Sequence, residues 1–238
     1  MNVSSLKVTP ERTVFSPANS LVVSILASIS FAFLAFWVAR GGSTVPGVDL
    51  RLHAWAMAHR TPGTIAFARI ITWGGITRIV LPVLLVVGVL ATEGGREITR
   101  RLKSGLLISL VASVGAYLGL AINHSVARVR PPVTDWAGAA GGPSFPSGHS
   151  TVSSLFAASC AWLIATRVHA GWPRRALWIG ALLYPLAVGL SRIWLGVHWP
   201  TDVIGGWLYA LAWLAGSAAI VLTLRRRRAS IEAISSKS

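Results

Sequence analysis

Long apolar runs separated by short polar segments dominate this chain of 238 residues. A helix needs about 20 mostly apolar residues to cross a hydrocarbon core of about 30 Å, and six runs approach that length. They are Ala18–Val38, Ile76–Thr92, Leu102–Ile122, Ser150–Ala165, Ala176–Leu190 and Val203–Leu224. The shorter runs require tilt or a locally thinned bilayer. The pattern predicts an all-α fold, an integral membrane bundle of six transmembrane helices.

The segment Val48–Trp73, between the first two runs, mixes apolar and ionisable residues. Its ionisable residues are Arg51, His53, His59, Arg60 and Arg69. The segment is too charged for a span and too apolar for a free loop. It therefore predicts an interfacial amphipathic segment between spans 1 and 2, broken at Pro62-Gly63. His53 and His59 have no ligand-like companions in the sequence, so we expect them to be surface histidines.

Composition also favours a membrane protein. Hydrophobic residues make up 53% of the chain and charged residues 12%, which is about half of the charged share of soluble domains. The net charge of +15 would suggest a nucleic-acid partner for a soluble protein. Here the basic residues cluster between spans, as membrane topology requires, so no nucleic-acid partner is expected.

The distribution of basic residues predicts the orientation in the membrane. With the amino terminus in the cytoplasm, the cytoplasmic segments hold Lys7, Arg12, Arg96, Arg100, Arg101, Lys103, Arg167, Arg174, Arg175, Arg225–Arg228 and Lys237. Because cytoplasmic segments are enriched in Lys and Arg, both termini are predicted to be cytoplasmic and the opposite face extracytoplasmic. The expected divisions are a cytoplasmic lead at 1–17, a six-span domain at 18–224 and a basic cytoplasmic tail at 225–238. A compact chain whose single Cys160 cannot form an intramolecular disulfide is typical of a bacterial inner (cytoplasmic) membrane protein.

Polar residues gather on the predicted extracytoplasmic side, at the ends of the apolar runs. They are Arg128, Arg130, Ser147, Gly148, His149, Arg192, His198 and Asp202. Ionisable side chains at a membrane boundary are costly to desolvate, so a functional role is their default interpretation. Arginines, histidines and a single carboxylate together suit the chemistry of phosphate esters.

Each step in the hydrolysis of a phosphate ester has a candidate residue. Arg130 and Arg192 carry guanidinium forks that bind phosphate oxygens in pairs. A helix that begins at Ser147-Gly148 directs free N–H groups at an anion. The departing oxygen needs an acid, and the phosphorus needs a nucleophile.

Two histidines are candidates for these last two tasks. Pro200 favours the first turn of a helix, which places Asp202 where it can accept a hydrogen bond from His198 and stabilise its imidazolium. We therefore predict that His198 is the nucleophile, with Asp202 as its support, and that His149 is the general acid.

Simpler interpretations exist for every one of these residues. Ser147 or Ser150 could only cap a helix, Asp202 could only face the helix dipole, and Arg128 and Arg130 could be flanking charges. The occurrence of all of them at one membrane face favours a functional site.

These residues resemble the motifs of the type 2 phosphatidic acid phosphatases, also called lipid phosphate phosphatases, which are related to the vanadium haloperoxidases. The family pattern is K-x6-R-P, then P-S-G-H, then S-R-x5-H-x3-D. The second block is Pro146–His149, the third is Ser191–Asp202 with every defining position matched, and the first ends in Arg130-Pro131. The resemblance covers Ala18–Leu224.

The resemblance implies a membrane hydrolase that acts on a lipid-linked phosphate or diphosphate, such as undecaprenyl or another polyprenyl diphosphate, phosphatidic acid or phosphatidylglycerol phosphate. It implies a phosphohistidine at His198 and phosphate binding by Arg130, Arg192, Ser147 and Gly148. Neither a metal nor a cofactor is implied. The expected partners are the lipid substrate and the bilayer, and the oligomeric state is left open.

One position departs from the family pattern. The family lysine should lie seven residues before Arg130, where this chain has Asn123. Losing a charge-assisted contact typically costs about 1.5–3 kcal/mol. Arg128 or His124 could compensate, so Asn123 and Arg128 are also assigned to substrate binding. Two alternatives therefore stay open, a lipid phosphotransferase and a non-catalytic phospholipid-binding or transport protein, the second of which Asn123 favours.

Overall fold

A computed structural model describes residues 16–41, 44–91, 98–165 and 168–235. This part of the chain contains α-helices and two short 3-10 helices but no strand. The helices are α1 (Pro17–Arg40), α2 (Gly47–His59), α3 (Pro62–Thr72), η1 (Trp73–Gly75), α4 (Thr77–Ala91), α5 (Ile98–Val126), η2 (Val133–Asp135), α6 (Gly148–Ala165), α7 (Trp172–Trp194) and α8 (Pro200–Ser235). The prediction of an all-α fold is confirmed.

All six predicted spans coincide with helices, namely α1, α4, α5, α6, α7 and α8. Four stretches of the described residues are long and apolar enough to cross a membrane: Pro17–Arg40, Gly105–Val126, Trp172–Trp194 and Pro200–Ser235. A fifth is added if α3 with η1 and α4, which meet at an angle of 55°, are counted as one bent span. The chain is a multi-pass membrane protein, and these criteria give four or five spans rather than the predicted six.

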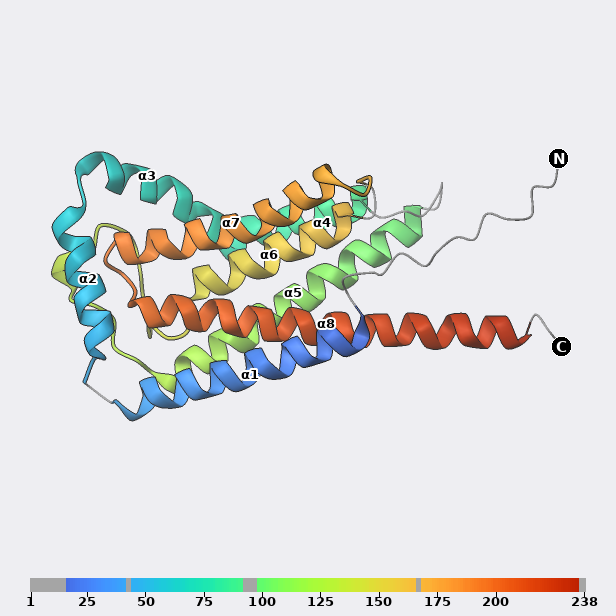
Figure 1. The fold of residues 1–238 in the computed structure, drawn as a ribbon. Helices are drawn as coiled ribbons and strands as arrows, with labels where there is room; N and C mark the ends of the chain where they lie inside the picture. Colours follow the sequence, from blue (N-terminus) through green and yellow to red (C-terminus); the bar gives the residue numbers. More distant parts are fainter. Residues whose placement is uncertain (1–15, 42–43, 92–97, 166–167, 236–238) are drawn as a thin grey trace.

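The outer helices carry the apolar surface that a bilayer requires. In α1, the side chains of Leu26, Ile29 and Phe33 are 60%, 62% and 71% exposed. A contiguous exposed apolar face of this kind is stable against lipid and unfavourable in water. Helix α1 lies along α8, as Figure 1 shows, and its remaining face is free to contact lipid.

Helix α6 is the central element of the bundle. It contacts α4, α5, α7 and α8, and most of its residues are buried. Leu155 and Leu163 of α6 pack with Leu84 of α4 and Ala210 of α8 in the principal apolar cluster. Because α6 is held on all sides, the residues at its amino-terminal end are fixed relative to the helices around them.

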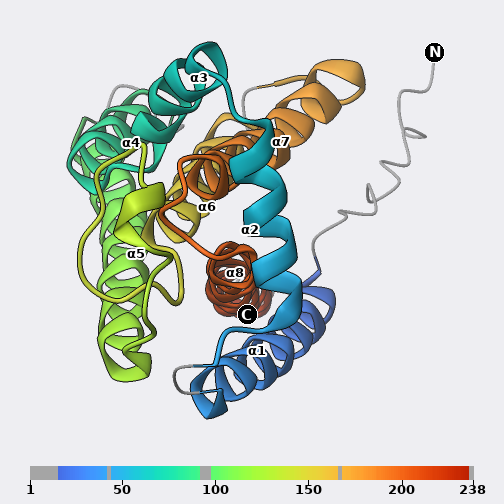
Figure 2. The same cartoon turned by 90° about the vertical axis from the view of Figure 1, so that its left-hand side faces the viewer.

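The predicted amphipathic segment forms two helices that close one end of the bundle. Helix α2 crosses that end, as the end-on view in Figure 2 shows, and buries Asp49, His53 and Ala56. Helix α3 begins at Pro62, where the sequence predicted a break, and Thr61 caps it by accepting a hydrogen bond from the Thr64 N–H at 3.3 Å. The buried residues of α2 tie this segment to the bundle.

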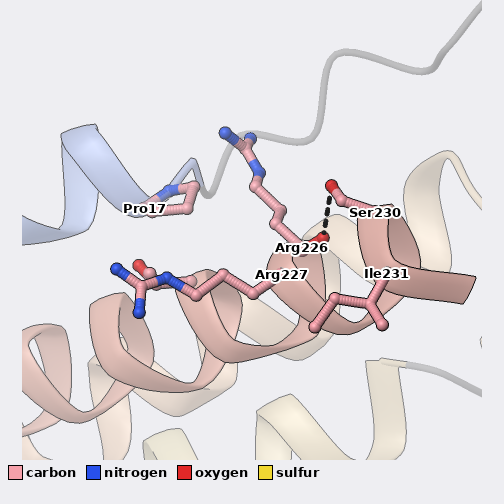
Figure 3. A pocket seen from close by; sticks show the side chains of 6 residues that line it. Pro17, Arg226, Arg227, Ser230 and Ile231 are labelled. Carbon is pink, nitrogen blue, oxygen red and sulfur yellow. Dashed lines mark hydrogen bonds between the residues drawn. The ribbon is translucent and has the colours of Figure 1, made fainter. Parts of the chain in front are cut away.

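The basic tail continues α8 without interruption as far as Ser235. A hollow at this end is lined by Pro17, Thr223, Arg226, Arg227, Ser230 and Ile231 (Figure 3). It contains no histidine or carboxylate and lies at the opposite end of α8 from His198. Several of the basic residues from which the orientation was predicted fall outside the described residues, namely Lys7, Arg12, Arg96, Arg167 and Lys237. Most of the predicted lead at 1–17 also falls outside them.

Candidate active site

The three motif segments meet at the end of the bundle that α2 covers. A cavity of about 250 Å³ lies there, bordered by α4, α5 and the start of α6. Among the residues that line it are Asn123, Arg130, Gly148, His149, Arg192 and His198. The structure therefore brings both predicted catalytic imidazoles and both predicted phosphate-binding arginines to one cavity.

The imidazole of His198 is held between a carboxylate and a guanidinium. Its Nδ1 lies 3.3 Å from Oδ2 of Asp202, and its Nε2 lies 2.9 Å from an NH group of Arg130. A guanidinium can only donate, so Nε2 must be the acceptor and Nδ1–H the donor to Asp202. This tautomer places the Nε2 lone pair on the cavity side, where a nucleophile is needed.

Asp202 owes its position to the local start of α8. Pro200 occupies the first turn, and Oδ2 of Asp202 accepts the Trp199 backbone N–H at 2.8 Å. A carboxylate in the first helical turn is stabilised by the helix dipole. His198 and Asp202 are 2% and 0% exposed, so one buried carboxylate both caps α8 and contacts the imidazole of His198.

Arg128 lies behind Asp202 and does not line the cavity. It donates to Oδ1 of Asp202 at 2.5 Å and to Oδ2 of Asp49 at 2.6 Å, and its side chain is 6% exposed. The structure thus places Arg128 away from the phosphate-binding position that the sequence suggested. Its charge balances two buried carboxylates, which would otherwise be costly to desolvate.

Asp49 is the residue that sequence reasoning missed. It is fully buried in the first turn of α2, where it accepts hydrogen bonds from the backbone N–H of Thr201 at 2.9 Å and from the Thr201 hydroxyl at 2.6 Å. The only hint in the sequence was that acidic residues are rare in this chain, which has 7 of them among 238 residues. Asp49, Arg128, Asp202 and His198 form a continuous buried chain of contacts from α2 to the cavity.

Arg130 shapes the loop that closes the cavity. It donates to the backbone carbonyls of Gly141, Gly142 and Pro143, each at 2.9 Å, and to that of Val197 at 2.7 Å. Burial lowers the pKa of Arg130, while Asp202 acts in the opposite sense. With so many contacts, its position is fixed before a ligand arrives.

Arg192 is a buried cation at the end of α7. It is 2% exposed and donates to the Thr72 hydroxyl at 2.8 Å and to the Ala139 carbonyl at 3.1 Å. Its Nε is buried without a hydrogen-bond partner in the described part of the chain. Because buried polar groups are nearly always paired, this unpaired donor is an exception, and it belongs to a guanidinium that lines the cavity.

The start of α6 and Asn123 complete the cavity wall. Ser147 caps α6, its hydroxyl lying 3.5 Å from the Ser150 N–H, and Gly148 and His149 follow in the first turn. The amide nitrogen of Asn123 donates to the carbonyls of Pro143 and Pro146, both at 3.1 Å. Asn123 therefore steadies the chain that leads into Ser147, and it lies at the cavity wall without supplying a charge.

Comparisons with known proteins agree with this geometry. The model of the PAP2 superfamily matches residues 104–226, which make up just over half of the chain and include all three motif segments. The chain belongs to the PAP2 superfamily.

Several relatives of this chain are named as phosphatases that act on lipid-linked phosphates. Phosphatidylglycerophosphatase B of Bacillus subtilis is 28% identical over 185 residues, which cover 77% of this chain and 88% of the relative. Decaprenylphosphoryl-5-phosphoribose phosphatase of Mycolicibacterium smegmatis is 34% identical over 63% of this chain and 75% of the relative. The undecaprenyl-diphosphatase of Sulfolobus acidocaldarius is 32% identical over about half of each chain, 49% and 53%.

A solved structure shares the PAP2 fold seen here. The crystal structure of the first transmembrane PAP2 type phosphatidylglycerolphosphate phosphatase from Bacillus subtilis superposes with a TM-score of 0.71. It is 24% identical, and the match covers 82% of this chain and 94% of the other. This likeness concerns the fold.

The electrostatics of the PAP2 site favour a neutral His198. Burial lowers the pKa of His198 to about 4, and the charges of Arg130 and Arg192 lower it further against the opposing effect of Asp202. A neutral imidazole keeps its lone pair, so His198 has the protonation state that the predicted nucleophile requires across the physiological pH range.

A pH profile checks this electrostatic arrangement. We expect the acidic limb of kcat/KM to lie well below the ordinary histidine value of about 6.5 and towards 4, because His198 loses its lone pair only when pH falls through its lowered pKa. The measurement uses a lipid phosphate whose own titration is determined in the same detergent. A limb at 6.5 or above that is not due to the substrate would contradict the assignment.

His149 packs against the backbone of η1. A Cβ added at Gly75 would lie 2.7 Å from Cβ and Cδ2 of His149, closer than side chains approach. Gly75→Ala is therefore expected to displace this imidazole and lower kcat by about tenfold to a hundredfold, since small misplacements of catalytic groups are costly.

Steady-state kinetics of Gly75→Ala tests this expectation. Gly180→Ala in α7, where an added Cβ has open space, is the matched control and should retain wild-type kcat. An unchanged kcat in Gly75→Ala would show that the position of His149 is not limiting.

His53 differs from the prediction of a surface histidine. It is 6% exposed, and its Nε2 lies 2.9 Å from Oδ2 of Asp135. Arg60 donates to the Asp135 carbonyl at 2.5 Å. These contacts attach η2 to α2 outside the cavity, a long-range pairing that local sequence spacing does not reveal. His59 is exposed as predicted.

Proposed function

We propose that this chain hydrolyses a lipid-linked phosphate or diphosphate through a phosphohistidine at His198. The chain is a phosphatase of the PAP2 superfamily. The observation that carries the mechanism is the placement of His198, whose Nδ1 lies 3.3 Å from Asp202 and whose ring lines a cavity that His149 also lines.

The first chemical step forms a bond between Nε2 of His198 and phosphorus. Arg130, Arg192 and the N–H groups at the start of α6 stabilise the charge on the non-bridging oxygens. The bond from phosphorus to the departing oxygen breaks, and His149, in its protonated form, gives that oxygen a proton. An arriving phosphate competes with Nε2 for the Arg130 guanidinium, which frees the lone pair for attack.

The second step releases phosphate to water. His149, now neutral, takes a proton from a water molecule that attacks phosphorus, and the bond to Nε2 breaks. Asp202 stabilises the positive imidazole ring throughout. Asp49 and Arg128 fix Asp202 from behind.

We also propose how the chain is arranged in the membrane. All six apolar helices span the bilayer, including the short α4 and α6, with both termini in the cytoplasm of a bacterial cell and the cavity on the outer side of the inner membrane. The catalytic unit is 18–224, and 225–238 is a basic tail that remains cytoplasmic. Support comes from the basic side chains of Arg225–Arg228, which lie at the end of α8 remote from His198.

Release of inorganic phosphate by purified protein in detergent tests the function. We expect turnover of phosphatidic acid and of a polyprenyl diphosphate in the presence of EDTA, together with an acid-labile phosphoprotein in rapid quench. Transfer of the label to an added alcohol in place of water would instead identify a phosphotransferase. Binding without release or transfer would favour a lipid-binding protein, the alternative that Asn123 raises.

A further inference from the structure

A second and larger hollow adjoins the catalytic cavity. Its volume is about 840 Å³, and it opens beside α3, η1 and the start of α4. The two spaces share Thr77, Ala139, Gly148, His149 and Arg192. Most of its lining lies outside the PAP2 motifs, including Arg69, Thr72, Trp73 and Arg78.

The larger hollow is strongly positive. Arg69, Arg78 and Arg192 line it, and its lining contains no carboxylate. Among the residues that the structure describes, no acidic side chain forms an ion pair with Arg69 or Arg78. Arg69 uses Nε to donate to the Ala137 carbonyl at 2.7 Å, which leaves its terminal NH groups available. Three arginines without a counter-charge favour an anionic ligand.

The positions of His149 and His198 indicate which part of a substrate reaches the larger hollow. His198 lines only the smaller cavity, whereas His149 lines both. In an in-line displacement the departing oxygen lies opposite the nucleophile, next to the acid that protonates it. The group attached to that oxygen therefore continues past His149 towards Arg69 and Arg78.

Apolar side chains accompany the arginines. Trp73 borders the hollow and is 63% exposed, and Ile76 lies beside it. A leaving group that fits this lining has an anionic part near the reacting oxygen and an apolar part beyond it. A lipid that carries a phosphoryl group has both.

We propose that Arg69 and Arg78 form a leaving-group subsite that binds a second phosphoryl group of the substrate. The inference rests on the proposed function and names its preferred substrate class, lipids with two phosphoryl groups. For a lipid diphosphate, Nε2 of His198 bonds to the terminal phosphorus and the bridging P–O bond breaks. The lipid monophosphate departs with the proton from His149, its remaining charge facing the two arginines.

The decisive measurement is a ratio of kcat/KM values, for a polyprenyl diphosphate over phosphatidic acid. In the double variant Arg69→Gln/Arg78→Gln we expect this ratio to fall about tenfold or more, since each charge-assisted contact contributes roughly a factor of ten. Arg69→Lys/Arg78→Lys keeps the charge and should recover most of the ratio. Phosphatidylglycerol phosphate has two phosphoryl groups that are separated by glycerol. Its kcat/KM in the same variants shows whether the subsite requires the two phosphoryl groups to be adjacent.

Arg51→Gln is the matched control, because Arg51 is an exposed arginine of α2 that lines neither space. An equal fall of the ratio in Arg51→Gln would assign the effect to general surface charge and overturn the subsite. The subsite would also be overturned if the ratio of kcat/KM values in the double variant stayed within twofold of the wild-type ratio. The same holds if the double variant were inhibited less by inorganic phosphate while that ratio did not change. Absence of phosphate release by the wild type from every lipid would instead refute the proposed function.

Discussion

Replacing His198 with alanine is expected to lower phosphate release from lipid phosphates by at least about 10⁴-fold, since loss of a nucleophile removes the whole covalent route. The expectation follows from the position of Nε2, which borders the cavity and faces the guanidinium of Arg130. No other described imidazole shares both that cavity and a carboxylate partner.

Two measurements separate lost chemistry from lost folding in this variant. The exposed His59, whose ring contacts the carbonyl and the indole of Trp55 and does not line the cavity, provides the control His59→Ala, which should keep wild-type turnover. His198→Gln fills more of the buried space than alanine and should be equally inactive while eluting as the wild type in detergent. Labelled phosphoprotein that still forms in a folded His198 variant would remove this residue from the nucleophile's role.

Asp49→Asn is expected to cost both stability and rate. Breaking a buried ion pair by removing one partner costs about 3–5 kcal/mol, and Asp49 and the Arg128 side chain are 0% and 6% exposed. With Asp49 neutral, the charge of Arg128 is balanced by Asp202 alone. Asp202 then accepts less effectively from His198, and kcat should fall by about a hundredfold with KM little changed.

The kinetic effect must be distinguished from simple loosening of the fold. A less effective Asp202 lowers the pKa of His198 further, so the acidic limb of the pH profile should move to lower pH in Asp49→Asn. His53→Gln is the control from the same helix, because it breaks the buried contact with Asp135 outside the cavity. It should lower the unfolding temperature without moving the limb. If both variants change the profile alike, Asp49 is structural only.

Local sequence rules were sufficient for the helices and for the contact between His198 and Asp202. The apolar runs located each long helix, and Pro200 fixed the helix start that puts Asp202 in the first turn, within reach of His198 just before the helix. Ser147 capped α6 as one of the two serines proposed. These features depend on spacing within a single segment, which a sequence displays directly.

The surroundings of the site depended on pairings that no spacing encodes. Arg128 was assigned to phosphate because its charge could compensate for the missing family lysine, yet its guanidinium binds Asp202, which lies 74 residues away along the chain. Asp49 is farther still, 79 residues from Arg128. Asn123 was judged by the charge it lacks, whereas its amide serves the backbone before Ser147. The predicted count of six spans was not confirmed, because α4 has 15 residues and counts only together with α3 and η1, and α6 is not among the described stretches that are long and apolar enough to cross a membrane.

Helix α2 has a consequence for anyone who would redesign this enzyme. Every motif residue lies within residues 104–226, the part of the chain that the superfamily defines, but Asp49, Thr72 and Gly75 come from the amino-terminal part. A chimera that grafts residues 104–226 onto a foreign amino-terminal half would keep the complete signature and lose these supports. Exchange of α2 through η1 together with the signature is the minimal transplant that we expect to work.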